Sequence, residues 1–452
     1  MPASSATASR SLYAEKVNPQ WSRLLDVLQM NVRYRRCSGA VLTTADGRSI
    51  LDFLSGYCVH NTGHNHPAIV AALKAELDSD GPAMLQSHAP DLAGELASRL
   101  VTRAGGALDR AFFCSSGSEG IEAAIKFSRA ATGRAALLYA EGSFHGLTCG
   151  ALSLMSDRFW KEGFGPLLPG TEAVPFGDLK ALAKRLATRN FAAYIAEPIQ
   201  SEAGVRLPDR SYWREVQRWC RRYGTLLVLD EVQTGLHRTG PFLAAHRYGI
   251  EPDMVVLAKA LSGGLIPSGA LLTTGRVSDQ VYSSIGRALI HTSTFSENGL
   301  AMRAGLATLD VLESERLGER AERLGTLLRR SLREALSGYE MVQEIRGEGL
   351  LTGIVFTAPQ QLRLRAAFEA FRRIHPAMFG QVLVMRLFRN HNILTQICGN
   401  NFMVLKANPP LVATEAQILA FVEAVRQVVE NAHTSITFWS EALGMAQRLL
   451  NV

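Results

Sequence analysis

Several features that would direct this 452-residue chain to a membrane or to secretion are missing. No stretch approaches the roughly 18 uninterrupted apolar residues that a transmembrane helix requires, so we expect no membrane span. Residues 1–10 are small and polar, without the apolar core of a signal peptide, and we expect a disordered lead-in. Internal repeats and low-complexity linkers are also absent. These absences favour an ordinary globular protein.

The cysteines are few, and they show no disulfide or metal-binding pattern. There is no CxxC pair and no regular spacing among the six, which are Cys37, Cys58, Cys114, Cys149, Cys220 and Cys398. In a chain of this length, such a pattern indicates reduced thiols and therefore a cytoplasmic protein. We also expect no metal site.

Two nucleotide-binding signatures are absent as well. The chain has neither a GxGxxG fingerprint nor a glycine-rich loop ending in GKS or GKT, which removes the main support for a dinucleotide-binding enzyme or an NTPase. The net charge is +7. The basic residues are scattered along the chain, so we expect a solvated basic surface and no nucleic-acid partner.

Strand and helix patterns alternate through the middle of the chain, as they do in a largely parallel sheet with crossover helices. Apolar residues at near-helical spacing predict a helix over residues 119–131. Strands are predicted at residues 111–114, 135–139, 192–196, 225–229 and 254–257. Each ends in a polar or glycine-rich segment, and in such sheets ligands bind at the carboxyl ends of the strands.

Lys259 is the most informative residue of the sequence. It follows the predicted strand 254–257, and Asp230 follows the predicted strand 225–229. A lysine and an aspartate at two strand ends are what a pyridoxal phosphate (PLP) enzyme needs. The lysine amine bonds to the cofactor aldehyde, and the carboxylate keeps the pyridine nitrogen protonated so that the ring can accept electrons.

Two turns offer further parts of a cofactor site. Ser116-Gly117-Ser118 precedes the predicted helix, where backbone N–H groups and a serine hydroxyl can bind a phosphate. A serine in this place is also a common helix cap without any ligand. Phe144 and His145 form part of a second turn, where an aromatic ring can stack on a flat cofactor. Both residues also fit ordinary core and loop positions.

Taken together, the motifs resemble those of class III aminotransferases, the ornithine and ω-amino acid type of PLP fold type I. They occur in that family's order at residues 51–56 (LDFLSG), 61–67 (NTGHNHP), 115–119 (SSGSE), 143–146 (SFHG), 197–204 (EPIQSEAG), 229–235 (LDEVQTG), 258–259 (AK) and 291–295 (HTSTF). The resemblance implies an α/β fold in which a large domain, with a mainly parallel sheet flanked by helices, is joined to a smaller α+β domain.

The expected domain division follows the same pattern. Residues 1–60 should contribute to the small domain and the active-site entrance, residues 61–310 should form the large PLP-binding domain, and residues 311–452 should form the small domain. Beyond a predicted helix at 417–430, residues 436–450 place their apolar side chains on one helical face. We therefore expect an extra terminal helix.

The resemblance implies catalytic roles for two residues. Lys259 would carry the cofactor and move the proton of the substrate, and Asp230 would pair with the pyridine nitrogen. Gln233 would contact the ring hydroxyl. Phe144, next to His145, would stack on the ring.

The resemblance also implies a phosphate site and a shared active site. Gly117 and Ser118, together with Ser116, would bind the phosphate, and Glu197 would support the aspartate. Thr294 would reach the phosphate of the cofactor in the neighbouring subunit, which implies a homodimer.

One position departs from the family pattern. Members that act on ornithine or acetylornithine usually carry an arginine before the apolar-Pro-Pro segment, and Lys406 stands at that position. Lysine is a point charge and lacks the bidentate fork of arginine. Glu202, which matches the family's arginine-pairing glutamate, is retained, so an ion pair and two separate surface charges are both open. With Tyr57 and Cys58 near the entrance, these are the candidate substrate-binding residues.

The segment 362–389 is a second departure. Its apolar residues are dense and helically spaced, which is typical of core, although an apolar wall over the substrate channel is an alternative. Together with residues 400–406, it resembles aminotransferases of secondary metabolism that aminate hydrophobic aldehydes or ketones, including the prodigiosin-pathway type.

We therefore predict a PLP-dependent aminotransferase that moves an amino group between an amino donor and a hydrophobic aldehyde or ketone in biosynthesis. Two alternatives stay open. One is an ornithine- or acetylornithine-type enzyme of amino-acid metabolism, with Lys406 in place of arginine. The other is a PLP decarboxylase or mutase on the same scaffold. The presence of both Lys259 and Asp230 argues against a non-catalytic role.

Overall fold

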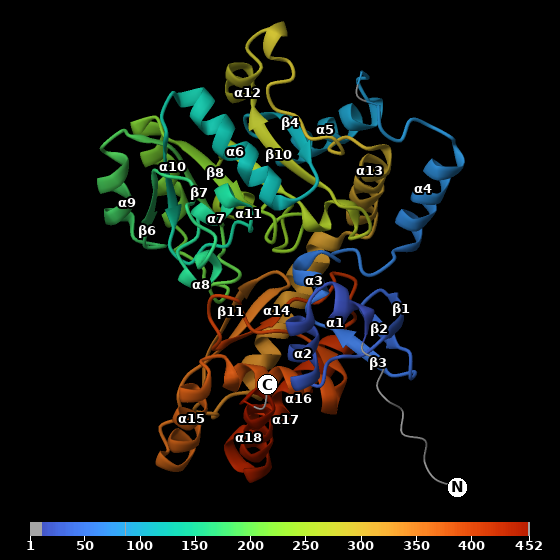
Figure 1. The fold of residues 1–452 in the computed structure, drawn as a ribbon, viewed down its shortest axis with the longest axis vertical. Coiled ribbons are helices and arrows are strands. Elements are labelled where there is room, and N and C mark those ends of the chain that lie inside the picture. The colour runs from blue at the N-terminus through green and yellow to red at the C-terminus, as the bar shows by residue number, and fades with distance from the viewer. Residues whose placement is uncertain (1–10, 86, 451–452) are drawn as a thin grey trace.

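A seven-stranded sheet forms the centre of the upper half of the molecule (Figure 1). The computed structural model describes residues 11–85 and 87–450, so the expected lead-in lies outside the described residues. The strand order is β4-β10-β9-β8-β7-β5-β6. The strands are β4 (Leu108–Cys114), β5 (Ala136–Ala140), β6 (Thr171–Val174), β7 (Phe191–Ala196), β8 (Leu226–Asp230), β9 (Met254–Leu257) and β10 (Gly269–Thr274).

The sheet is mainly parallel, as predicted. Strands β6, β5, β7, β8 and β9 pair in parallel, whereas β10 runs antiparallel to both β9 and β4. Five of the seven strands match the sequence prediction; β6 and β10 were not predicted. The parallel strands bring their carboxyl ends to one edge, where a ligand site is expected.

Both faces of the sheet are buried, which explains the nearly continuous apolar runs of its strands. Helix α6 (Gly117–Thr132) covers one face, and its apolar residues share a buried cluster with Val256. Helix α10 (Tyr212–Tyr223) covers the other face, where Trp213 lies in a cluster with Leu229. The remaining helices of this part are α4 (Pro67–Asp78), α5 (Asp91–Ala104), α7 (Cys149–Ser153), α8 (Arg158–Lys161), α9 (Leu179–Leu186), α11 (Ala244–Tyr248), α12 (Gly275–Val281) and α13 (Gly299–Ser314).

Two smaller sheets and the C-terminal helices form the lower half (Figure 1). One sheet has β1 (Tyr34–Ser38), β2 (Val41–Thr44), β3 (Ser49–Asp52) and β13 (Ile393–Leu394), and the other has β11 (Val342–Glu348), β12 (Leu351–Phe356) and β14 (Val404–Ala407). Because β13 pairs with β3, the N-terminal strands lie beside the C-terminal part of the chain. The domain boundaries near residues 60 and 310 stay a prediction. The other helices here are α1 (Leu12–Lys16), α2 (Pro19–Val27), α3 (Ser55–Cys58) and α14 (Leu317–Ala335).

The segment 362–389 belongs to the core. It forms α15 (Leu362–Ile374) and most of α16 (Met378–His391), and Phe368 and Phe379 are buried with their ring centroids 5.4 Å apart. No residue of the segment lines the candidate active-site cavity described below. The core interpretation therefore holds.

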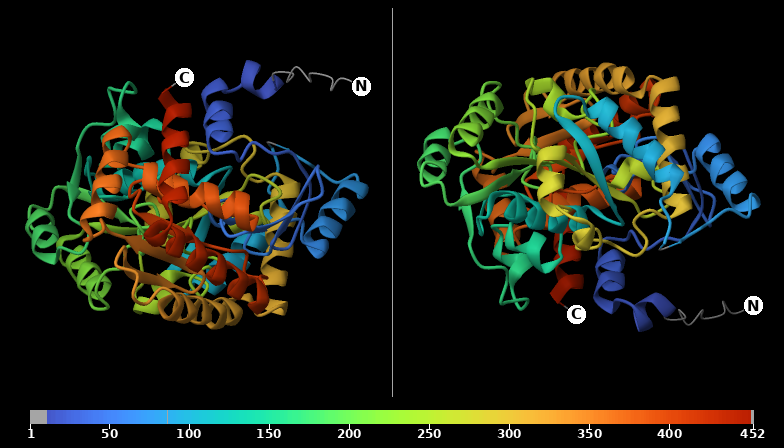
Figure 2. Two further views of the ribbon diagram at one scale, coloured as in Figure 1. Left: turned by 90° about the horizontal axis from the view of Figure 1, so that it is seen from below. Right: turned by 90° about the horizontal axis from the view of Figure 1, so that it is seen from above.

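The predicted terminal helix is present as α18 (Ile436–Leu450), which follows α17 (Glu415–Thr434). Phe438 is fully buried, and Arg386 Nε lies 2.9 Å from Glu441 Oε2. Arg448 donates to the carbonyl of Val27 in α2, and Figure 2 shows the red terminal helix on the same side of the molecule as the dark-blue helices α1 and α2. The terminal helix thus docks on its own chain. Within residues 11–85 and 87–450, none of the helices has the length and apolar character to cross a bilayer.

Candidate active site

A cavity of about 490 Å³ opens at the carboxyl edge of the large sheet. It is lined by nine of the residues that the sequence singles out, which are Ser116, Gly117, Ser118, Phe144, His145, Glu197, Asp230, Gln233 and Lys259. The candidates Tyr57, Cys58, Glu202, Thr294 and Lys406 are not among the lining residues. The structure thus brings nine of the cofactor candidates to one cavity, although they come from segments up to 143 residues apart, as the numbers 116 and 259 show.

Lys259 lies just beyond β9, where it opens a short 3-10 turn, Lys259–Ser262, that ends at Gly263. Its φ of 49° lies in the left-handed region, which is strained for a residue with a side chain and is frequent at functional sites. Burial lowers the pKa of the Lys259 amine, and Asp230 opposes this shift without cancelling it. Burial therefore favours the neutral amine, the form that can act as a nucleophile or a base.

Asp230 ends β8 and is held by two contacts. Its Oδ1 accepts the backbone N–H of Val232 at 3.0 Å, and its Oδ2 lies 2.8 Å from Nδ1 of His145. His145 is buried, and its Nε2 is without a hydrogen-bond partner in the described part of the chain. The histidine orients the carboxylate at the cavity wall.

Glu197, just after β7, organises the loop that carries Phe144. Its two carboxylate oxygens accept the backbone N–H groups of Phe144 at 2.9 Å and Ser201 at 3.2 Å. Burial raises the pKa of Glu197 well above its ordinary value, and the nearby Asp230 adds to the shift. Burial therefore disfavours the charged form of Glu197 beside Asp230.

The N-terminus of α6 supplies the anion-binding side of the cavity. Ser116 is the helix cap, and its hydroxyl accepts the N–H of Glu119 at 3.2 Å. Gly117 and Ser118 begin the helix, whose first N–H groups and dipole attract an anion. Gly146, with φ of 114°, passes so close to Ser118 that any β-carbon there would collide with it.

The four substrate-binding candidates lie beside this cavity. Lys406 is fully buried, and its Nζ donates to both oxygens of Glu202, at 2.8 and 2.9 Å. The same Nζ lies 4.6 Å from the centre of the Tyr57 ring. Of the two alternatives left open by the sequence, the ion pair is the one present. Cys58, the residue after Tyr57, is buried and belongs to a small apolar cluster.

Lys406 and Glu202 each shift the pKa of the other toward the charged form. Burial alone would lower the pKa of Lys406, but Glu202 raises it above its ordinary value. Burial also acts to raise the pKa of Glu202, and Lys406 outweighs it and lowers that pKa. Both groups are therefore charged. Glu202 also accepts a weak hydrogen bond from Gln233 Nε2 at 3.3 Å, which links the pair to the cavity.

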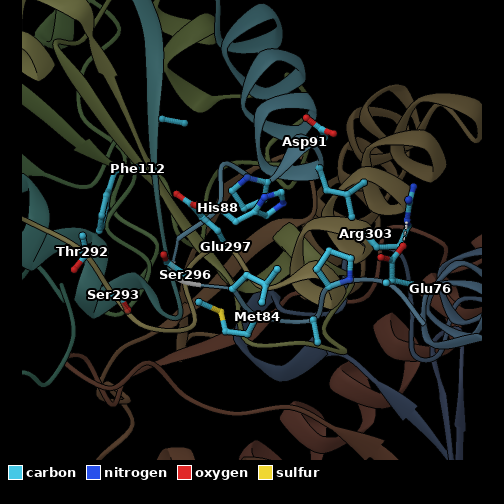
Figure 3. Close-up of a pocket in the computed structure, with 18 of the residues that line it drawn as sticks. Glu76, Met84, His88, Asp91, Phe112, Thr292, Ser293, Ser296, Glu297 and Arg303 are labelled. Atoms are coloured by element: carbon cyan, nitrogen blue, oxygen red, sulfur yellow. Dashed lines mark hydrogen bonds and ion pairs between the residues drawn. The ribbon is translucent and has the colours of Figure 1, made fainter. Parts of the chain in front are cut away.

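A second cavity, of about 880 Å³, is larger but lacks the lysine and the aspartate. Figure 3 shows Met84, His88 and Arg303 around it, with Thr292 and Ser293 on its far wall. It lies between the segments 81–92 and 288–299, next to the candidate Thr294, which is exposed. In the described part of the chain, His, Cys, Asp and Glu form no group of three that could hold a metal ion.

A family model described as "Aminotransferase class-III" matches residues 25–429. The chain is a class III aminotransferase. It is 38% identical to aminotransferase PigE of Serratia sp. (strain ATCC 39006) over 96% of this chain and 54% of PigE, so it spans about half the length of that relative. Among solved structures, it resembles the Toxoplasma gondii ornithine aminotransferase, with a TM-score of 0.79, 30% identity and coverage of 89% of this chain and 91% of the other. It also resembles a PLP-bound amine transaminase from an uncultivated Pseudomonas species, with a TM-score of 0.76, 28% identity and coverage of 87% and 94%.

The cofactor of this aminotransferase is pyridoxal 5'-phosphate. The residues of the 490 Å³ cavity fit it. The amine of Lys259, whose pKa burial lowers, suits the aldehyde, the carboxylate of Asp230 suits a protonated ring nitrogen, and the N-terminus of α6 suits the phosphate. Nε2 of His145, which finds no hydrogen-bond partner among the described residues, is a further buried polar atom at this corner.

Sequence reasoning missed several residues of this aminotransferase's site. Ser201 donates to Gln233 Oε1 at 2.9 Å and fixes the direction of that amide. Trp160 packs edge-on against Phe144, with ring centroids 5.4 Å apart, and donates to Asn400 at 2.8 Å. Trp160 has no periodic signal in the sequence, because it lies on a one-turn helix. Other lining residues come from Val59 and the segment 264–268.

Proposed function

We propose that this aminotransferase transfers an amino group between an amino donor and a hydrophobic aldehyde or ketone, in a biosynthetic route of secondary metabolism. The observation that carries the proposal is the buried Lys406, whose Nζ is committed to both oxygens of Glu202 and covered by Tyr57. A lysine held in this way offers no planar fork for the α-carboxylate of an amino acid. Acceptors without such a carboxylate should therefore be tolerated.

Apolar surface around the cavity supports the same proposal. Leu265, Ile266 and Pro267 lie on the wall that follows the Lys259 turn, and Val59 faces the cavity as well. Burial of each methylene of a substrate chain is worth about 0.8 kcal/mol. Activity should therefore rise with the length of the acceptor until the pocket is full. The similarity to a transaminase named for amines agrees with this expectation.

The ornithine- or acetylornithine-type alternative has its own support. The chain is 30% identical to the Toxoplasma gondii ornithine aminotransferase, and Glu202 is retained. In that reading, Lys406 would leave Glu202 and bind the substrate carboxylate. Its full burial and its two short contacts with Glu202 make such a release costly.

We further infer the roles of the cavity residues. PLP supplies an electron sink for the substrate carbon when it is bound. Lys259 Nζ would take and return the substrate proton, which its lowered pKa permits. Asp230 would hold the proton on the ring nitrogen, with His145 keeping the carboxylate in place. Phe144 would cover one side of the site, braced by Trp160.

A substrate series tests the proposal. Straight-chain aldehydes and amines of increasing length should be compared with ornithine and N-acetylornithine by their kcat/KM. We expect the hydrophobic compounds to be preferred, and a hundredfold preference for the ornithine compounds would establish the alternative instead. Lys406→Arg should raise the preference for α-carboxylates, because it restores the bidentate fork.

We also propose a homodimer in which Thr294 reaches the cofactor of the partner subunit. The 880 Å³ hollow beside Thr294 and the apolar residues exposed around it, among them Leu85 and Leu289, suit a surface that a second copy covers. The six cysteines are all free thiols, which supports the proposed cytoplasmic location.

A further inference from the structure

The short element α3 (Ser55–Cys58) is not a regular α-helix but a turn whose backbone is left-handed at four consecutive residues. The φ values are 47° at Ser55, 60° at Gly56, 61° at Tyr57 and 70° at Cys58. Three of these residues carry side chains, which the left-handed region disfavours. Such strain persists only where the surroundings hold the backbone firmly, and it is concentrated at functional positions. The contacts that hold this turn are therefore informative.

One neighbouring residue, Asp52, and two distant ones, Arg238 and Asn408, hold the turn. Asp52 Oδ1 accepts the backbone N–H groups of Leu54 at 2.9 Å and Ser55 at 2.7 Å. The Ser55 hydroxyl donates to the carbonyl of Asn408 at 2.7 Å and accepts from Arg238 Nη2 at 3.2 Å. The first residue of the turn is thus anchored through both its backbone and its side chain.

Arg238 is the centre of this arrangement. It is fully buried, and all five of its N–H groups go to uncharged acceptors. Besides the Ser55 hydroxyl, these are the side-chain oxygen of Asn61, at 3.2 and 2.6 Å, and the carbonyls of Leu350 at 3.1 Å and Pro409 at 2.6 Å. A buried guanidinium without a carboxylate in its hydrogen-bond set is costly for folding. Its geometry, which joins the N-terminal segment to two C-terminal loops, indicates a positioning role.

The turn places Tyr57 over the buried ion pair. The Tyr57 ring lies 4.6 Å from Lys406 Nζ, and Tyr57 as a residue is 39% exposed while Lys406 is fully buried. Tyr57 therefore contacts both the buried ammonium group and the solvent. A cation beneath an aromatic face is stabilised by it, most strongly when it is desolvated. Movement of the turn would uncover the lysine and weaken its attachment to Glu202.

We propose that Arg238 is a positioning residue that holds the left-handed turn Ser55–Cys58 so that Tyr57 covers the Lys406–Glu202 pair, and that this cover sets the discrimination between substrates with and without a carboxylate. The second half rests on the function proposed above. None of the five hydrogen bonds of Arg238 reaches a residue that lines the cavity. Arg238 therefore acts through Ser55 and Tyr57.

The accessibility of Lys406 tests the first half without any substrate. The holoenzyme is treated with acetic anhydride, and acetylation of Lys406 relative to the exposed Lys180 is measured by peptide mass spectrometry. We expect Lys406 to be protected in the wild type and at least tenfold more reactive in Tyr57→Ala and Arg238→Lys. Tyr57→Phe keeps the aromatic cover and should keep the protection.

A milder variant separates exposure of Lys406 from a general loss of folding. Ser55→Gly removes the hydroxyl that Arg238 and Asn408 hold, while glycine accepts the left-handed backbone without strain. We expect it to raise the reactivity of Lys406 as Arg238→Lys does. A fall in Tm in both variants, with the reactivity of Lys406 unchanged relative to Lys180, would show a purely structural arginine and overturn the proposal.

Steady-state kinetics test the second part of the proposal, that the cover of Tyr57 sets substrate discrimination. For Ser55→Gly and Arg238→Lys, the ratio of KM values for 2-oxoglutarate and a hydrophobic aldehyde should change at least threefold, with kcat changing much less. An unchanged ratio together with an exposed Lys406 would overturn the specificity claim and leave the positioning claim standing. Failure of the substrate assignment itself would appear in the wild-type substrate series, whereas the labelling result does not depend on it.

Discussion

At the scale of single residues, Lys259 and Asp230 line one cavity from the ends of the neighbouring strands β9 and β8. The contact between Asp230 and His145 joins residues 85 positions apart, and no local pattern reports it. The same holds for Lys406 and Glu202, 204 positions apart, whose pairing the sequence left open.

Asp230→Asn should leave a folded enzyme with a kcat lower by a factor of about 100 to 1,000, since a group of this kind contributes about 3–4 kcal/mol. An amide does not stabilise a protonated ring nitrogen, and it changes the contact with His145. Steady-state kinetics at saturating PLP, with the bound cofactor quantified, would measure the effect.

Asp253→Asn is the matched control. Asp253 precedes β9 at the opposite edge of the sheet, where it accepts the N–H of Leu227 and pairs with Arg276. That variant should lose stability and keep its kcat. If Asp230→Asn also kept a near-native kcat, the role given to Asp230 would be wrong.

At the scale of elements, periodicity predicted the helices and strands that lie in continuous apolar patterns. The helix at 436–450 follows from its single apolar face, and the strands of the large sheet follow from short apolar runs. Strand direction was beyond this reasoning, because β10 is as buried as its neighbours and its antiparallel course depends on how the connection 258–268 reverses the chain. The left-handed turn at Ser55–Cys58 was also unpredictable, since only one of its four residues is glycine.

Phe438→Ala should destabilise the protein by about 3–5 kcal/mol, the usual cost of deleting a buried aromatic side chain. Phe438 is fully buried in α18, with its ring 6.3 Å from that of Phe379 and its face under the Arg386 guanidinium. Thermal denaturation should show a clear fall in Tm. The matched change Leu443→Ala, on the exposed side of the same helix, should leave Tm nearly unchanged. Equal effects of the two changes would mean that α18 is not docked as described.

Glu231 leads to a prediction of how the stability of the folded protein depends on pH. Its carboxylate accepts the first N–H groups of α11, from Ala244 and Ala245, and burial raises its pKa to about 7. A carboxyl group whose folded pKa exceeds its unfolded value of 4.5 favours folding at low pH, and this contribution is lost as pH rises from 4.5 to 7. The lost stability is roughly 3 kcal/mol.

The comparison with Glu231→Gln isolates this effect from other titrations. The difference in unfolding free energy between wild type and variant should be most favourable to the wild type near pH 4.5 and decline toward pH 7. Denaturation curves at several pH values would measure it. A difference that grows with pH would show that Glu231 is ionised in the folded protein.

At the scale of the whole molecule, the order of the motifs was enough to predict the class of fold, because the segments that build the site are separate but follow one another along a parallel sheet. What could not be predicted is how the N-terminal and C-terminal segments meet. Arg238 reaches the loops at Leu350 and Pro409, 112 and 171 residues away, through backbone carbonyls that carry no sequence signal. Contacts of this kind depend on the assembled chain and become visible only in the structure.

The proposed dimer makes a prediction about surface residues. Leu289 is 81% exposed and lines the 880 Å³ hollow, whereas Leu362 is 85% exposed on α15. Figure 1 shows α15 at the lower end of the molecule, away from helices α4, α5 and α13, which carry residues of the hollow. Leu289→Asp should shift sedimentation from dimer toward monomer, because it places a charge in an apolar contact. Leu362→Asp should leave the sedimentation unchanged. A wild-type protein that sediments as an active monomer would contradict the dimer itself.

Sharing of active sites can be tested by mixing two inactive variants. Lys259→Ala removes the lysine, and Thr294→Asp puts a negative charge where the partner's phosphate would lie. In a mixed dimer, one site then carries both defects, and the other combines an intact Lys259 with an intact Thr294 from the partner. Random exchange makes about half of the dimers mixed, so about a quarter of all sites should recover. If Thr294 served the cofactor of its own subunit, each site would keep exactly one defect and mixing would restore nothing, which separates a shared site from two independent ones.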